Sequence, residues 1–327
     1  MSYLVIAFYC FETIADPHAE VAIQKKFLQQ LDVTSRIYIS EQGMNGQMSA
    51  SLDAAEKYME WLKAREPFAK VDFKVQPYHE HVFPRLIVKY RKQLVALDRD
   101  VDMSKTAEHV SPVKWKEMLE DGTKRLVLDV RNDYECRVGH FEGAELPPCS
   151  EFRKFTKWLE GLKEEYDPAT TPVMMYCTGG IRCEVFSSLM KEEGFATIYQ
   201  LDGGVIKYAE KVGSAHWLGK LFVFDDRLTV PLAPNSTSVV GKCHHCGAAN
   251  ESYYNCASMD CNNLFLCCQE CLHKFEGCCT ENCQNGPRVR PLSHLTHKPY
   301  RKWYHYANKK EDLWKLRTTT KPADDAV

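Results

Sequence analysis

Ten of the fifteen cysteines in this 327-residue chain lie between Cys243 and Cys283, and this clustering constrains the fold more than any other feature. A segment so rich in cysteine holds too few large apolar residues to fold by hydrophobic burial alone. No apolar run is long enough to span a membrane, and no basic segment of a signal peptide precedes the first one. We therefore expect a cytoplasmic protein, in which clustered cysteines usually bind metal rather than form disulfides.

The spacing of these cysteines predicts two metal sites. Two Cys-x-x-Cys pairs have the spacing at which both thiolates can reach one tetrahedral zinc, and two looser pairs are suited to a second ion. The first set is Cys243, Cys246, Cys268 and Cys271, and the second is Cys256, Cys261, Cys279 and Cys283. Cys267 lies next to Cys268, and Cys278 next to Cys279, so the exact choice of ligands stays open. An iron–sulfur cluster is the main alternative to structural zinc.

The remaining sequence predicts a multidomain α/β and α+β protein. Residues 1–97 alternate strand-like and helix-like segments in the order of a ferredoxin-like α+β domain. Polar residues 98–110 are expected to form a linker. Apolar strands separated by helical stretches in 111–228 indicate a parallel α/β domain with a C-terminal extension. A cysteine-rich module at 240–286 and a basic, aromatic tail at 287–327 complete the expected organisation.

A candidate catalytic loop follows the strand-like segment PVMMYC. Cys177 ends this segment, and the small residues after it allow the backbone N–H groups to point toward its sulfur. A helix beginning near Glu184 adds its positive end, and Arg182 adds a cation. This environment favours a thiolate or the terminal sulfur of a persulfide. The residues of the loop between the cysteine and the arginine are Thr178, Gly179, Gly180 and Ile181.

Three segments resemble the signatures of a rhodanese domain over roughly residues 110 to 215. These segments are LDVRNDYECRVGHFEGA, YCTGGIRCE and YQLDGGVIKY. The resemblance implies that Cys177 is the catalytic residue, that Arg182 closes the active loop, and that Asp129 and Arg131 support it from the neighbouring strand end. Four residues separate Cys177 from Arg182, as in sulfur-handling members, whereas related phosphatases have five.

Nearly the whole chain is similar to bacterial rhodanese-type tRNA uridine hydroxylases. The N-terminal EQGMNGQMS, the phrase FVFDDR, and the segments GKCHHCG and YNCASMDCN carry this resemblance. It implies oxygen-dependent hydroxylation of the wobble uridine in the tRNA anticodon loop to 5-hydroxyuridine, with Cys177 essential. Molecular oxygen is then the expected co-substrate. No glycine-rich fingerprint of a flavin or nicotinamide site is found.

Two further groups of residues carry side chains capable of redox chemistry. Cys183 is a candidate resolving thiol for Cys177, but its place in the first turn of the following helix favours a structural role. In YHEHVF, His79 and His81 share one face of an expected strand while Glu80 lies on the other, which disfavours a two-histidine, one-carboxylate iron site.

The segment Pro287–Lys321 carries ten Lys or Arg against two acidic residues, although the net charge of the chain is only −2. Its interleaved aromatic residues can stack on bases while the cations contact phosphates. We expect Arg301, Lys302, Trp303 and Tyr304 to contact tRNA. The alternative is a solvated basic tail, and basic residues from Arg85 to Lys92 can form or extend the RNA surface.

Two other functions use the same residues. One is a sulfurtransferase that acts through a Cys177 persulfide. The other is a zinc-dependent RNA-binding adaptor whose rhodanese domain only docks or senses, which the presence of both Cys177 and Arg182 disfavours.

Overall fold

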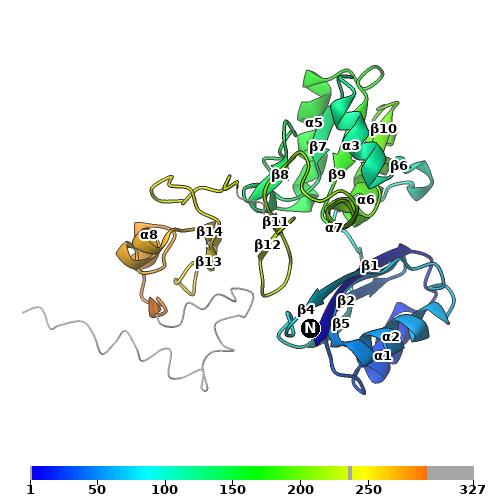
Figure 1. The fold of residues 1–327 in the computed structure, drawn as a ribbon, viewed down its shortest axis with the longest axis horizontal. Helices are drawn as coiled ribbons and strands as arrows, with labels where there is room; N and C mark the ends of the chain where they lie inside the picture. The colour runs from blue at the N-terminus through cyan, green and yellow to red at the C-terminus, as the bar shows by residue number, and fades with distance from the viewer. Residues whose placement is uncertain (1, 235–237, 293–327) are drawn as a thin grey trace, which may run out of the picture. The chain divides into compact units, whose positions relative to one another are not determined.

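A computed structural model describes residues 2–234 and 238–292 of the chain (Figure 1). These residues divide into two compact units. The first comprises residues 2–136, 140–217 and 232–234, and the second comprises residues 137–139, 218–231 and 238–292. Among the described residues, no helix is both long and apolar enough to cross a membrane.

The N-terminal part of the first unit has the predicted ferredoxin-like order, with one added strand. Its sheet has the order β4-β1-β3-β2-β5, in which β5 lies parallel to β2 at one edge and the other pairs are antiparallel. Both helices cover the same face of the sheet (Figure 1), and Ile6, Met48 and Leu62 lie in the core between them. The elements are β1 (Tyr3–Phe11), α1 (Pro17–Leu28), β2 (Val33–Ser40), β3 (Gly43–Ser51), α2 (Leu52–Lys63), β4 (Lys74–Tyr78) and β5 (Leu86–Tyr90).

The central part of the first unit is the predicted parallel α/β domain. Its sheet has the order β6-β10-β9-β7, and every pair of strands is parallel. The strands are β6 (Glu108–Val110), β7 (Leu126–Asp129), β9 (Val173–Tyr176) and β10 (Ile198–Leu201), with the short β8 (Gly139–Phe141) between β7 and β9 in sequence.

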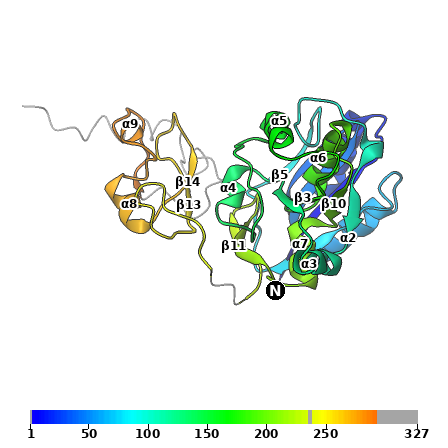
Figure 2. The same ribbon diagram turned by 90° about the horizontal axis from the view of Figure 1, so that it is seen from above.

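Helices cover both faces of this sheet. All four residues of β9 are buried, as expected for a parallel strand between two helical layers. α5 (Phe155–Glu165) and α6 (Ile181–Glu192) pack on one face through Phe155 and Phe186. α3 (Pro112–Glu120) and α7 (Gly204–Lys211) lie together on the other face (Figure 2). Short helices are η1 (Met103–Lys105), α4 (Asp133–Cys136) and η2 (Phe152–Lys154).

The predicted linker 98–110 is only partly a linker. Residues 108–110 form β6 and pair with β10 at the edge of the parallel sheet, while Val101 and Met103 pack on the same core as Phe186. An edge strand has one unpaired side and tolerates polar residues, which is why this segment resembles a linker in sequence.

The second unit contains a β-ribbon and the cysteine-rich module. β11 (Trp217–Phe222) pairs with β12 (Thr229–Pro231), and β13 (Tyr253–Asn255) pairs with β14 (Leu264–Leu266). α8 (Gln269–Lys274) and α9 (Glu281–Gln284) follow. The module extends beyond its predicted end at residue 286, because Val289 lies in its core and Arg290 donates a hydrogen bond to the carbonyl of Cys256 at 2.6 Å.

Candidate active site and metal-binding clusters

Cys177 directly follows β9, at the carboxyl end of the parallel sheet. Its side chain is fully buried, and its Sγ accepts a hydrogen bond from the backbone N–H of Gly180 at 3.1 Å. Gly180 caps α6 with a φ of 107°, a left-handed conformation that favours glycine. α6 therefore begins at Ile181, earlier than the predicted start near Glu184, and places its N-terminus directly beside the sulfur.

This loop is built to hold an anion on the sulfur. Burial opposes ionisation of the Cys177 thiol, but hydrogen bonding with the Cys183 side chain, the charge of Arg182 and the backbone N–H groups of Cys183 and Arg182 outweigh it. Together they lower the pKa of Cys177 to about 5. At neutral pH the sulfur is then a thiolate, which is the nucleophilic form of cysteine.

A second helix supports the loop from the other side. The backbone N–H of Val205, in the first turn of α7, donates to the carbonyl of Cys177 at 3.0 Å, and Ile206 donates to Thr178 at 3.1 Å. A Cβ atom on Gly204 would lie 2.5 Å from the Cys177 carbonyl oxygen, so only glycine permits this approach. The signature YQLDGGVIKY thus holds the catalytic loop in place through hydrogen bonds from its own backbone N–H groups.

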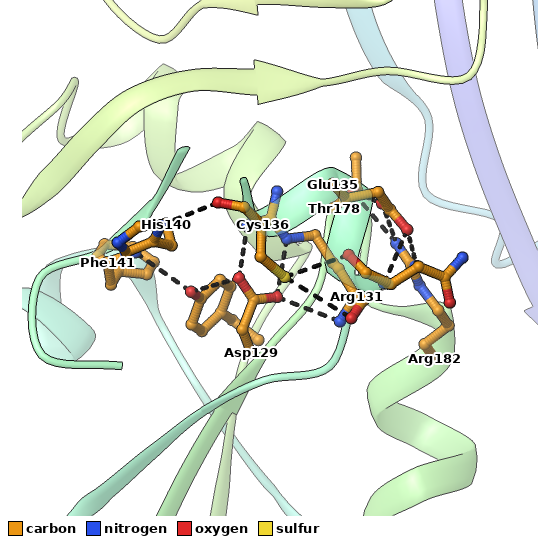
Figure 3. Close-up of polar contacts among 10 residues, drawn as sticks. Asp129, Arg131, Glu135, Cys136, His140, Phe141, Thr178 and Arg182 are labelled. Atoms are coloured by element: carbon orange, nitrogen blue, oxygen red, sulfur yellow. Dashed lines mark hydrogen bonds and ion pairs between the residues drawn. The ribbon is translucent and has the colours of Figure 1, made fainter. Parts of the chain in front are cut away.

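Arg182 is held against a buried carboxylate that sequence analysis did not identify. Its guanidinium donates to Glu135 at 2.5 and 2.9 Å, and to Thr178 at 3.3 Å (Figure 3). Glu135 is fully buried on α4. These two hydrogen bonds hold the Arg182 guanidinium beside the loop in one orientation. The motif quoted around Leu128 contains Glu135, but nothing in its spacing marks that residue as the partner of Arg182.

We expect Arg182→Ala to raise the pH midpoint for alkylation of Cys177 above about 5, because a cation that lowers the pKa is lost. tRNA modification should fall by about 10²-fold or more. Quantitative peptide mass spectrometry after iodoacetamide treatment at a series of pH values measures the midpoint. Arg153→Ala, which removes an arginine that is about half exposed, should leave it in place. An unchanged midpoint in Arg182→Ala would show that backbone donors alone hold the thiolate.

Asp129 and Arg131 form a second buried ion pair at the end of the neighbouring strand. Arg131 donates to both carboxylate oxygens of Asp129, at 2.8 and 2.5 Å, and both side chains are fully buried. Tyr176 donates to the same carboxylate at 2.7 Å. These contacts tie the end of β7 to the end of β9, one residue before Cys177. The pair therefore lies at the strand ends from which the catalytic loop begins.

Cys183 and one residue far away in sequence, Tyr9, also adjoin the loop. Cys183 lies in the first turn of α6, is fully buried, and interacts with Cys177 through its side chain. The hydroxyl of Tyr9, from β1, donates to Glu184 at 2.9 Å. A Cβ atom on Gly180 would lie 2.8 Å from this hydroxyl, so Tyr9 reaches the active loop itself. The sequence gives no signal for this contact, because Tyr9 and Gly180 belong to different domains.

The predicted metal ligands gather into two clusters of four. The first contains Cys243, Cys246, Cys268 and Cys271, and the second contains Cys256, Cys261, Cys279 and Cys283. Within each cluster all sulfur atoms lie within 4.8 Å of one another. The distances Cys246–Cys268 and Cys261–Cys279 are 3.8 and 3.6 Å, close to the roughly 3.8 Å edge of a tetrahedral zinc–thiolate site. Both clusters could hold a metal ion.

Among the residues that the structure describes, the two histidines of YHEHVF have polar partners outside the catalytic loop. His81 forms hydrogen bonds with Ser49 at 3.1 Å and with Asp32 at 3.0 Å. His79 is exposed, and its Nε2 lies 3.9 Å from a carboxylate oxygen of Glu80. The predicted RNA contacts Arg301, Lys302, Trp303 and Tyr304 lie outside the described residues. The alternative basic residues Arg85, Lys89, Arg91 and Lys92 are all exposed, on β5 and next to it.

Comparison with protein families divides the chain in the same way. Residues 3–94 match the UPF0176 acylphosphatase-like domain, residues 111–211 match the rhodanese-like domain, and residues 218–284 match the rhodanase C-terminal family. The first two matches correspond to the ferredoxin-like and parallel α/β domains. The third covers most of the ribbon and the cysteine-rich module.

Similar proteins cover almost the whole chain. A tRNA uridine(34) hydroxylase from Protochlamydia amoebophila is 59% identical over 313 residues, which cover 95% of this chain and 97% of the relative. The protein of the same name from Chlamydia pneumoniae is 52% identical over 92% of this chain and 93% of its own length. The relative from Chlamydia felis is 52% identical over 93% of this chain and 94% of its own.

Proposed function

Because this chain belongs to the tRNA uridine(34) hydroxylase family, we propose that it hydroxylates the wobble uridine of tRNA to 5-hydroxyuridine, with Cys177 as the catalytic residue. The single observation that supports this role best is the fully buried Cys177 thiol whose pKa is lowered to about 5 by the loop, Cys183 and Arg182. Thiolates are strong nucleophiles toward electron-poor carbon atoms. The substrate also implies a cytoplasmic location.

Nucleoside analysis of tRNA tests this function directly. We expect tRNA from cells that lack the protein to lose 5-hydroxyuridine and its derivatives at the wobble position, and the purified protein to restore the modification. Accurate mass or retention time is needed, because hydroxylation and thiolation change the nominal mass almost equally. Formation of a thiolated nucleoside would instead support the sulfurtransferase alternative.

Molecular oxygen is part of the proposal as the source of the added hydroxyl group. One oxygen atom would be inserted into the C5–H bond and the other would leave as water, which requires two electrons from a reductant and two protons. Isotopically heavy O₂ should therefore label the product, whereas heavy water should not. Label from water alone would remove oxygen from the reaction.

We further propose that the two cysteine clusters hold structural zinc, one ion each. Each cluster offers four thiolates at tetrahedral spacing, leaving no open position of the kind that a catalytic zinc needs. Backbone N–H groups support the sulfur atoms, since Cys268 donates to Cys243 and Cys279 donates to Cys256, both at 3.4 Å. Such hydrogen bonds orient the ligands and stabilise their negative charge.

We propose that the basic tail holds tRNA, because the small catalytic loop can contact little more than the reacting base. Deleting residues 293–327 should weaken tRNA binding and reduce the salt dependence of the affinity, since phosphate contacts are lost. The deletion starts after Val289 and Arg290, which pack in the metal module. Binding measured over a salt series, together with alkylation of Cys177, separates loss of RNA contacts from loss of the fold.

The same experiment distinguishes the tail from the alternative surface on the N-terminal domain. If the truncated protein binds tRNA as tightly as the full chain at every salt concentration, the tail is a solvated basic face. The contacts would then be sought at the exposed residues Arg85, Lys89, Arg91 and Lys92, whose combined alanine variant should lose affinity instead.

A further inference from the structure

A buried lysine of the N-terminal domain has no function in the family motifs described above. Lys74 begins β4, and its side chain is only 5% exposed. The carboxylate nearest to it in the same segment, Asp72, lies 4.0 Å from Nζ and is 65% exposed, too far for a hydrogen bond. A buried ammonium with such weak compensation is costly to the fold, which makes it a candidate for a functional role.

Lys74 is connected to the catalytic loop through Tyr9. The Lys74 ammonium lies over the Tyr9 ring, 5.1 Å from its centre, and the Tyr9 hydroxyl donates to Glu184 at 2.9 Å. This hydroxyl also lies against Gly180, whose N–H donates to the Cys177 sulfur. Burial lowers the pKa of Lys74 and the charge of Lys207 lowers it further, whereas the charges of Asp72, Asp202 and Cys177 raise it. The contacts Lys74–Tyr9 and Tyr9–Gly180 therefore connect the ammonium to the loop that holds the thiolate.

The other cations near the loop are already neutralised. Arg182 is paired with Glu135 through two hydrogen bonds, and Lys207 is paired with Asp202 at 2.7 Å. Lys74 differs, because its nearest partners are an aromatic face and a distant carboxylate. Of these three cations, Lys74 is the one whose charge is least compensated and hence most available to a new anion.

We propose that Lys74 is a catalytic residue, which pairs with the negative charge that develops on a carbonyl oxygen of the target uracil when the Cys177 thiolate adds to C6. This inference rests on the proposed function. In the addition, a bond forms between Sγ and C6, the π bond between C5 and C6 breaks, and its electron pair becomes an enolate on O4. C5, the atom that hydroxylation changes, thereby becomes nucleophilic. No electrons are gained or lost overall, and the positive charge of Lys74 balances the enolate.

A tRNA carrying 5-fluorouridine at the wobble position tests this step without hydroxylation, because the electron-withdrawing fluorine makes C6 more electrophilic. A proton taken from solvent at C5 then converts the enolate into a neutral thioether adduct that reverses slowly. We expect the wild-type protein to form an adduct that survives denaturing electrophoresis, and Cys177→Ser to form none. Lys74→Met keeps the length of the side chain without its charge and should slow adduct formation by about 100-fold. Lys70→Met removes an exposed lysine shortly before β4 and should react at the wild-type rate.

A second variant keeps the test valid if Lys74→Met folds poorly. Lys74→Arg retains the charge and should react faster than Lys74→Met, while alkylation of Cys177 by iodoacetamide reports whether the loop is intact in each variant. Adduct formation by Lys74→Met at the wild-type rate would overturn the role of Lys74. A wild-type protein that hydroxylates ordinary tRNA but forms no adduct would also overturn it, whereas absence of hydroxylation would reject the proposed function itself.

Discussion

Replacement of Cys177 by serine is expected to lower tRNA hydroxylation by about 10³-fold or more, as removal of a nucleophile does in other enzymes. Serine is nearly isosteric with cysteine and can still accept the hydrogen bond from Gly180. Its hydroxyl does not ionise near neutral pH, however, so the anion that the loop is built to hold is lost. The amount of 5-hydroxyuridine formed by the purified variant measures the effect.

The matched control is Cys149→Ser. Cys149 is buried in the same hydrophobic core as Cys177 but lies outside the catalytic loop. Its replacement therefore also places a hydroxyl group in that core, but it leaves the Cys177 thiolate in place. Both variants should have similar thermal stability, and only Cys177→Ser should be inactive. Hydroxylation near the wild-type level by a folded Cys177→Ser protein would exclude the thiol from the mechanism.

Local patterns in the sequence predicted the elements of the site that depend on neighbouring residues. The Cys177 loop needs glycine where the backbone adopts a positive φ, and Gly180 marks that position. The Cys-x-x-Cys pairs bring two sulfur atoms together within one turn, so Cys243 and Cys246 were recognisable from spacing. The alternation of apolar strands and helices likewise indicated the parallel sheet, because each unit of it is short and local.

Contacts between residues far apart in the chain could not be predicted in this way. Glu135 precedes its partner Arg182 by 47 positions, and Tyr9 precedes Glu184 by 175. Which carboxylate meets a buried arginine depends on how the elements pack, and a single sequence carries no pairwise signal for it. Lys74 was missed for the same reason, since a lone lysine at the start of a strand resembles an ordinary surface residue until its burial is known.

The boundaries of the domains were obscured by composition. Residues 108–110 are polar yet form an edge strand, and Val289 and Arg290 belong to the metal module although they lie in a basic segment. Arg290 is buried because its guanidinium donates to backbone carbonyls of the module, including that of Cys256. A domain boundary drawn from charge alone therefore placed Arg290 in the tail instead of the module.

Loss of one metal ligand should have the second large effect, and it should be confined to the cysteine-rich module. Cys246→Ala removes one of four sulfur atoms from the first cluster, and we expect bound zinc to fall from two ions to one per chain. A structural zinc contributes about 10–16 kcal/mol to the folding of a small module, so its loss should unfold the segments that carry the first cluster, around residues 243–246 and 268–271. Hydrogen exchange should then increase there but not in the sheet that carries Cys177.

Cys267→Ala is the control, because Cys267 is buried in the same module but belongs to neither cluster. It should retain two metal ions and normal exchange, which separates loss of a ligand from loss of packing. Chelation of the wild-type protein, which removes both ions, should extend the unfolding to the whole module. Iron and acid-labile sulfide in the purified protein would contradict the assignment to zinc. The module would then contain a redox centre, and the electrons for hydroxylation would have a source within the chain.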